Sequence, residues 1–126
     1  MNATLQHRDC IMIVEDDAEL REGLASLLAL EGYDVETAAD GREALERLRS
    51  GALPPCLILL DLMMPTMSGW EFRREQSRDP ALCRVPVIVV TGDANAEQKA
   101  QQLAAAAFLS KPYDFDRLMK LVRTYC

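Results

Sequence analysis

The sequence lacks the features that mark membrane proteins and nucleic-acid-binding proteins. Its longest apolar runs, around residues 11–14 and 85–90, are far shorter than the roughly 20 residues of a membrane-spanning helix. Residues 1–9, MNATLQHRD, are polar and unlike a signal peptide. The 14 lysines and arginines form no basic cluster, and the net charge is −6. We therefore expect a cytoplasmic protein that binds neither membranes nor nucleic acid directly.

Cysteine and histidine are few and do not follow metal-binding spacings. Cys10, Cys56, Cys83 and Cys126 are far apart, and no CxxC pair occurs. We interpret them as reduced and mostly buried thiols. The one histidine, His7, lies in the polar leader and is interpreted as a solvated residue.

Apolar runs of strand length alternate with stretches of helical periodicity. The runs predict buried strands at residues 10–14, 57–60, 85–90 and 107–110, and an alternating pattern predicts an edge strand at 34–38. A helix follows the first strand, with Leu20, Leu24, Leu27 and Leu28 on one face. Further helices are expected at residues 40–48, 70–78, 95–105 and 114–125, and the residues placed to cap helices are Asp17, Asp40, Ser68 and Asn95.

These elements predict one α/β domain. The 126 residues, 49% hydrophobic and 27% charged, suit a single globular unit, with a polar leader at residues 1–9 and the domain at residues 10–126. Continuously apolar strands separated by helices favour a parallel, doubly wound sheet covered on both faces. Such sheets bind ligands beyond the carboxyl ends of their strands.

Polar residues gather at that predicted edge. The first strand is followed by Glu15 and Asp16, the third by Asp61, the fourth ends at Thr91, and the fifth is followed by Lys111. Facing carboxylates repel one another unless a cation is present, and oxygen ligands suit Mg²⁺, with Mn²⁺ a second candidate. A lysine and a hydroxyl beside a carboxylate can receive a phosphoryl group, and the carboxylate can be the nucleophile.

The motifs IMIVEDD, LILLDLMMPTMSG, VIVVTG and FLSKP, in this order, resemble the receiver domain of two-component response regulators. The resemblance covers nearly the whole chain from Cys10. It implies a flavodoxin-like, CheY-like fold with five strands in the order 2-1-3-4-5 and five helices. It also implies a phospho-acceptor function rather than an enzyme acting on other substrates.

Specific roles follow from the same resemblance. Asp61 corresponds to the phospho-acceptor, Asp16 to a direct Mg²⁺ ligand and Glu15 to a ligand through water. Met63 corresponds to the residue whose backbone carbonyl completes the metal shell. The resemblance further assigns phosphoryl binding to Thr91 and Lys111, a switching aromatic to Phe108, and loop-shaping roles to Pro65, Gly69 and Pro112, the last after a cis peptide bond.

The implied mechanism is phosphoryl transfer to Asp61 from a histidine kinase, a histidine phosphotransfer protein or a small acyl phosphate. The added charge would reshape a partner-binding surface on the fourth helix, fifth strand and fifth helix. Phe108 can equally be an ordinary core aromatic. The downstream protein target is unknown, and the chain is expected to be a monomer or a weak homodimer.

Two departures from the family pattern affect details. The separation from Thr91 to Lys111 is about two residues short, so we expect the end of the fourth helix to be displaced. Met63 and Asp93 occupy positions that influence acyl-phosphate hydrolysis in the family, and the bulk of Met63 favours slow autodephosphorylation. Trp70 is expected to be partly exposed near the site.

Three other functions remain open. A pseudo-receiver would be an interaction module without phosphorylation, but it would normally have lost Asp16, Asp61 or Lys111. A haloacid-dehalogenase-like phosphatase also uses an aspartate nucleophile with Mg²⁺, although it usually has a second acid where Met63 stands. A flavodoxin-like electron carrier would have a phosphate-binding loop rich in serine and threonine after the first strand.

Overall fold

The computed structural model describes residues 10–51, 53–64, 66–92 and 94–126. Strands and helices alternate along the whole of this part of the chain, as the periodicity predicted. The strands are β1 (Cys10–Val14), β2 (Asp34–Ala38), β3 (Leu57–Asp61), β4 (Val87–Thr91) and β5 (Ala107–Ser110). The helices are α1 (Ala18–Leu30), α2 (Gly41–Ser50), α3 (Gly69–Arg78), α4 (Ala96–Gln102) and α5 (Phe115–Tyr125). The proposed leader at residues 1–9, including His7, lies outside the described residues.

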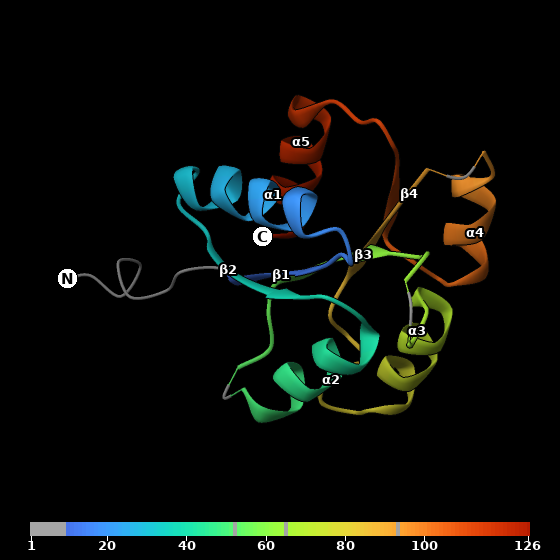
Figure 1. Ribbon diagram of the computed structural model, residues 1–126. Coiled ribbons are helices and arrows are strands. Elements are labelled where there is room, and N and C mark those ends of the chain that lie inside the picture. The colour runs from blue at the N-terminus through green and yellow to red at the C-terminus, as the bar shows by residue number, and fades with distance from the viewer. Residues whose placement is uncertain (1–9, 52, 65, 93) are drawn as a thin grey trace.

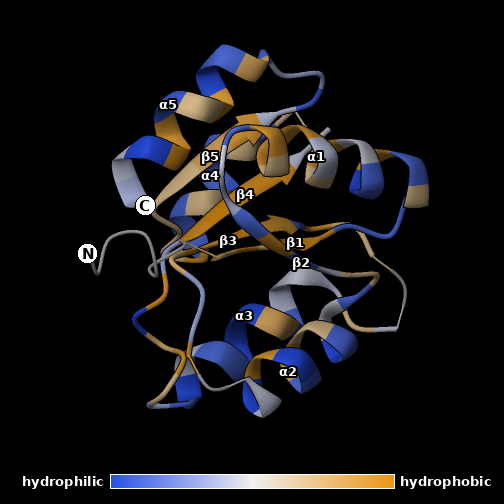
Figure 2. Cartoon of the chain, turned by 90° about the vertical axis from the view of Figure 1, so that its left-hand side faces the viewer, coloured by the Kyte–Doolittle hydropathy of each residue, from blue (hydrophilic) through white to orange (hydrophobic). Residues whose placement is uncertain are grey.

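The five strands form one parallel sheet in the order β2-β1-β3-β4-β5, which confirms the predicted topology. Helices α1 and α5 pack on one face, and α2, α3 and α4 pack on the other (Figure 1). Figure 2 shows the inner strands as a hydrophobic layer between helices whose outer sides are largely hydrophilic. Among the helices that the structure describes, none is both long and apolar enough to span a membrane.

The inner strands form the centre of the hydrophobic core. Every residue of β3 and β4 is buried, whereas the edge strand β2 alternates exposed, partly buried and buried positions. This difference explains why β2 has an alternating sequence and the inner strands do not. Each fully buried leucine or isoleucine stabilises the fold by roughly 1.5–3 kcal/mol, so the inner strands hold the sheet together.

Helix starts follow the predicted capping residues. Asp17, Asp40 and Ser68 accept hydrogen bonds from the first turns of α1, α2 and α3, and Ser68 forms a full capping box with Glu71. Asn95 is the N-cap residue of α4, as predicted, but its side chain makes no capping hydrogen bond. Helix α4 has only seven residues and ends at Gln102, three residues before the expected end. Soon after it, Ala104 adopts a left-handed backbone with φ of 55°.

Helix α1 is less buried than its leucines suggested. The helix contacts the sheet through Leu24, Ala25 and Leu28, of which Leu28 is fully buried. Leu20 and Leu27 lie at the margin of this contact and are 51% and 45% exposed. The helical spacing correctly placed the leucines on one side, but that apolar stripe is wider than the surface the helix covers.

A hydrogen-bond network ties α3 to its neighbours. The buried Gln76 donates from Nε2 to the carbonyls of Leu82 and Val85, over 2.9 and 3.0 Å, and so holds the connection to β4. Arg73, one turn earlier, donates from Nε to the Leu103 carbonyl at the end of α4, over 3.0 Å. These bonds satisfy carbonyls that the turns leave without helical partners.

The interpretation of all four cysteines as reduced thiols was wrong. Cys56, just before β3, forms a disulfide with Cys126, just after α5. Because the two residues are 70 positions apart, their sequence spacing indicated no pairing; the return of α5 toward the start of the strands brings them together. A disulfide that closes a loop of this length is expected to stabilise the fold by about 4 kcal/mol, because it restricts the conformations of the unfolded chain. Cys10 and Cys83 are free and partly exposed.

Candidate functional site

The register of the sheet brings the predicted site residues to one edge. Val14 pairs with Leu60 on the neighbouring strand. The next residue of each segment, Glu15 just after β1 and Asp61 at the end of β3, therefore lies beside the other. Thr91, the last residue of β4, pairs with Ser110, so Lys111 follows beside it. The Lys111 N–H donates to the Thr91 carbonyl over 2.8 Å, which extends this pairing to the lysine itself. Four different strands thus present their carboxyl ends to one small space.

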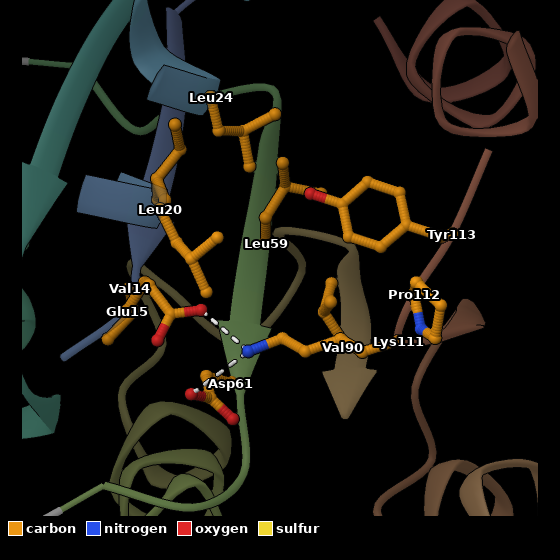
Figure 3. Close-up of a pocket in the computed structure, with 11 residues that line it drawn as sticks. Val14, Glu15, Leu20, Leu24, Leu59, Asp61, Val90, Lys111, Pro112 and Tyr113 are labelled. Atoms are coloured by element: carbon orange, nitrogen blue, oxygen red, sulfur yellow. Dashed lines mark hydrogen bonds and ion pairs between the residues drawn. The ribbon is translucent and has the colours of Figure 1, made fainter. Parts of the chain in front are cut away.

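Lys111 links the two buried carboxylates. Its Nζ lies 2.7 Å from Glu15 Oε1 and 3.6 Å from Asp61 Oδ2 (Figure 3). Glu15 and Asp61 are only 8% and 5% exposed, so water screens these interactions weakly. Lys111 is therefore bound more closely to Glu15 than to Asp61.

The loop after β1 is held by an arginine that the sequence pattern did not identify. Arg21, in the first turns of α1, donates from Nη1 to the Glu15 carbonyl over 2.8 Å and to the Asp16 carbonyl over 3.4 Å. The Asp17 N–H donates to Glu15 Oε2 over 3.2 Å. Because Arg21 binds backbone carbonyls, no partner side chain in the sequence signals its role. The contacts orient the acidic pair toward Asp61.

Burial and charge give the three ionisable groups different pKa values. Burial raises the pKa of Asp61 to about 6, and the neighbouring Glu15 adds to this effect. Burial also opposes ionisation of Glu15, but hydrogen bonds, above all from Lys111, keep its pKa below the usual value. Burial alone would lower the pKa of Lys111, yet Glu15 and Asp61 outweigh it and raise that pKa. The site thus contains a charged Glu15–Lys111 pair beside a carboxylate that ionises reluctantly.

The donor set fits a divalent cation. Glu15, Asp16 and Asp61 each offer a carboxylate oxygen, and these oxygens lie within 4.8 Å of one another. Asp16 is exposed, which leaves one side of the cluster open to water. Three carboxylates beside one lysine leave excess negative charge, and hard oxygen ligands with open positions suit Mg²⁺. The structure therefore brings the predicted acidic residues into a cluster suited to such an ion.

The loop after β3 is shaped around Asp61. The Met63 N–H donates to Asp61 Oδ1 over 3.1 Å, and the Met63 side chain is 68% exposed. Gly69 fits where no side chain could: an added Cβ would lie 2.8 Å from the Leu62 Cα and 2.9 Å from the Asp61 carbonyl oxygen. Pro65 and Asp93 lie outside the described residues. Trp70 is partly exposed, as expected, and packs beside the core.

The other predicted site residues lie on β4 and β5 and in the loops after them. Thr91 is fully buried. The Lys111–Pro112 peptide bond is cis, as the resemblance implied. Phe108 is partly buried on β5, and the Arg117 guanidinium lies 6.0 Å from the centre of its ring. An added Cβ at Gly92 would come no closer than 3.9 Å to Lys111, so this position leaves space beside the lysine.

An apolar cavity of about 490 Å³ adjoins the charged groups. Leu20 and Leu24 of α1 form one wall, Tyr113 forms the opposite wall, and Lys111 and Asp61 lie at the polar end (Figure 3). The partial exposure of Leu20 leaves this wall accessible from outside. The cavity could not be predicted from the sequence, because it depends on the space between α1 and the loop after β5.

Comparison with known proteins agrees with this geometry. The family model described as the response regulator receiver domain matches residues 11–123. Response regulator RR06 of Streptococcus pneumoniae is 38% identical over 117 residues, which cover 90% of this chain and 51% of that protein. The chain thus spans about half the length of this curated relative.

Solved structures of response regulators have the same fold. The chemotaxis protein CheY4 of Vibrio cholerae has a TM-score of 0.85 and 28% identity, covering 95% of this chain and all of that one. The response regulator TrrA of Thermotoga maritima, in complex with Mg²⁺ and BeF, has a TM-score of 0.82 and 30% identity, covering 94% of this chain and 99% of that one. The chain therefore belongs to the response regulator receiver domain family of two-component systems.

Proposed function

We propose that Asp61 accepts a phosphoryl group from a phosphohistidine donor and that the acyl phosphate switches a partner-binding surface. The observation that carries the proposal is the position of Lys111 between Glu15 and Asp61, at an edge where Asp16 follows Glu15 and the end of β4 supplies Thr91. A structural ion pair would not need three carboxylates around one lysine. A phospho-acceptor site needs such a cluster, because Lys111 and a cation must balance the charge of the carboxylates before transfer and the charge of the phosphoryl group after it.

Transfer follows from the positions of the side chains. A carboxylate oxygen of Asp61 attacks phosphorus, the bond from phosphorus to the histidine nitrogen breaks, and the imidazole leaves with the bonding electrons. Lys111 turns from Glu15 toward the oxygens of the transferred phosphoryl group. This movement is short, because the Lys111 Nζ already lies 3.6 Å from Asp61 Oδ2. The buried Thr91 hydroxyl supplies a further hydrogen bond from the neighbouring strand.

Glu15, Asp16, Asp61 and the Met63 carbonyl would hold Mg²⁺ in this proposal. When bound, the ion neutralises charge on the phosphoryl oxygens and on the acidic cluster. The related TrrA structure contains Mg²⁺ together with BeF, which supports the choice of metal. Occupation of the acidic pair would also compete with Lys111 for Glu15 and so free the lysine for the phosphoryl group.

The apolar cavity suits the donor protein. Leu20 is half exposed at the rim, and Tyr113 lies across from it, so a helix presenting a phosphohistidine could bury apolar side chains here and place its imidazole over Asp61. The donor is a histidine kinase or a histidine phosphotransfer protein. The site-distal surface formed by α4, β5 and α5, with Phe108 and Arg117, is the proposed output surface.

Intact-protein mass spectrometry after incubation with acetyl phosphate and Mg²⁺ tests the proposal. We expect one phosphoryl adduct, which is absent in Asp61→Asn and after metal chelation. Asp79→Asn is a matched control because this partly exposed carboxylate pairs with Arg49 at the end of α3 and is not part of the acidic cluster, so the variant should leave the adduct intact. If neither acetyl phosphate nor a phosphohistidine donor modifies the wild type, the pseudo-receiver function replaces this one.

The proposed receiver is not an enzyme acting on other substrates. It catalyses its own phosphorylation, and the acyl phosphate is then lost slowly. A haloacid-dehalogenase-like phosphatase would instead release phosphate from an added phosphomonoester with turnover. Measuring phosphate release from such a substrate separates the two functions.

A further inference from the structure

Two of the four cysteines form a disulfide at the edge of the sheet opposite the acidic site, and the backbone of a third lies beside it. The disulfide joins Cys56, before β3, to Cys126, after α5, with the two Cα atoms 5.4 Å apart. Cys10 begins β1 beside them: the Cys56 N–H donates to the Cys10 carbonyl over 2.9 Å, and the Cys56 Sγ lies 3.4 Å from the same oxygen. Figure 2 shows the C-terminus at the end of the sheet where the strands begin.

This disulfide is accessible to solvent. Cys56 and Cys126 are both partly exposed. A small thiol or a dithiol can therefore approach the sulfur atoms without unfolding of the core. The Cys10 side chain lines a pocket with Met12 and Leu48, which pack on the other face of the sheet from the disulfide. Burial, together with the charges of Glu36 and Asp34, also raises the pKa of the Cys10 thiol, so Cys10 is a weak competitor for exchange.

The disulfide lies next to contacts that join the end of α5 to the start of β5. Tyr125, next to Cys126, donates from Oη to the Ala106 carbonyl over 3.1 Å. Ala106 in turn donates its N–H to the Val87 carbonyl over 2.8 Å and leads directly into β5. Strand β5 lies at the edge of the sheet, with only β4 as a neighbour. The last turn of α5 and the start of β5 are thus held at one point.

We propose that Cys56 and Cys126 form a reversible redox site whose opening releases the last turn of α5 and the start of β5. In the reduction, the thiolate of a dithiol attacks one sulfur, the S–S bond breaks, and a mixed disulfide forms. The second thiol of the dithiol resolves this intermediate, leaving two protonated cysteines and an oxidised dithiol. Oxidation by a small disulfide such as glutathione disulfide reverses the change and yields two equivalents of thiol. The site is independent of phosphorylation at Asp61.

The test follows opening and its structural effect in the native protein. The purified chain is equilibrated with reduced or oxidised dithiothreitol, alkylated rapidly and analysed by peptide mass spectrometry. We expect Cys56 and Cys126 to be protected when oxidised, alkylated when reduced, and protected again after treatment with glutathione disulfide. On reduction, hydrogen exchange of peptides spanning residues 104–108 and 119–126 should rise about tenfold, whereas residues 57–60 should not change.

Single cysteine substitutions test which thiols form the redox site. Cys126→Ser should show the exchange pattern of the reduced wild type in either buffer, and Cys83→Ser, the matched control, should behave as wild type. Cys10→Ser should keep the Cys56–Cys126 bond. The proposal is overturned if reduction requires denaturant, if opening leaves exchange unchanged, or if Cys10 is found in the disulfide. Loss of acetyl phosphate labelling in both redox forms would count against the proposed function alone.

Discussion

Replacing Asp61 with asparagine should stabilise the metal-free protein at neutral pH. Burial and Glu15 raise the pKa of Asp61 to about 6, from a usual value of 3.8. The folded state therefore binds a proton at this carboxyl more tightly than the unfolded state does. Stability from this group is fully present below pH 3.8 and is lost as the pH rises through 6. At 1.36 kcal/mol per pKa unit, the loss at pH 7 is about 3 kcal/mol.

In the Asp61→Asn variant, the amide does not ionise, so the loss of stability caused by ionisation of Asp61 does not occur. We expect Asp61→Asn to exceed the wild type in free energy of unfolding by up to about 3 kcal/mol at pH 7, and the two proteins to converge near pH 4. Glu15 acts in the opposite direction, since its lowered pKa makes its contribution disappear as the pH falls. Because both proteins contain Glu15 and Lys111, the difference between their curves mainly isolates Asp61.

Urea unfolding followed by far-ultraviolet circular dichroism, in chelator and at several pH values from 4 to 7.5, measures the difference. Both proteins must be fully oxidised at Cys56 and Cys126, so that the disulfide contributes equally. Saturating Mg²⁺ should narrow the gap by stabilising the wild type. A difference that is independent of pH, or a variant less stable than wild type at pH 7, would refute the electrostatic account of the site.

Three further predictions concern packing and partner binding. Gly69→Ala should destabilise the fold by about 1–3 kcal/mol in urea unfolding, because the added Cβ would collide with backbone atoms. Gly23→Ala, on an open helix surface, should instead stabilise the fold by up to about 1 kcal/mol, and equal effects of the two substitutions would contradict this steric reasoning. Gln76→Met should cost about 1–3 kcal/mol, because the Val85 carbonyl loses its hydrogen bond from the amide and the Leu82 carbonyl keeps only the bond from the Val85 N–H. A loss near zero would mean that water replaces the amide. Leu20→Ala should slow phosphorylation by a phosphohistidine donor but not by acetyl phosphate, whereas Leu30→Ala, away from the cavity, should slow neither reaction. If Leu20→Ala slows phosphorylation by both donors, Leu20 affects the transfer step itself and not the binding of the donor protein.

The residues at the strand ends were predictable because strand length and parallel pairing determine where they lie. A run such as LILL is too short for a buried helix, so Asp61 had to follow a strand, and the same reasoning applied to Glu15 and Lys111. In a parallel sheet these positions must share one edge. Sequence reasoning therefore predicted that these residues lie together, without any knowledge of the distances between them.

Features that depend on contacts between distant elements could not be predicted. The pairing of Cys56 with Cys126 requires knowing where α5 ends relative to β3. The interactions of Arg21 and Gln76 are with backbone carbonyls, which leave no partner in the sequence. The exposure of Leu20 reflects how α1 is placed on the sheet, and helical periodicity reports only which residues share a side.

The register that gathers the acidic and basic groups has a consequence for how such a domain can diversify. Glu15, Asp61 and Lys111 are positioned by backbone hydrogen bonds between neighbouring strands, and Arg21 of α1 adds a contact to the loop after β1. The exposed side chains on the outer surfaces of the helices are not part of this alignment. Slipping a strand by one residue would turn its side chains to the opposite face and break up this cluster of charged groups. Helix surfaces can instead change residue by residue under selection for new partners. Gene duplication can therefore produce receiver domains with separate partners while the arrangement of Glu15, Asp61 and Lys111 stays constant.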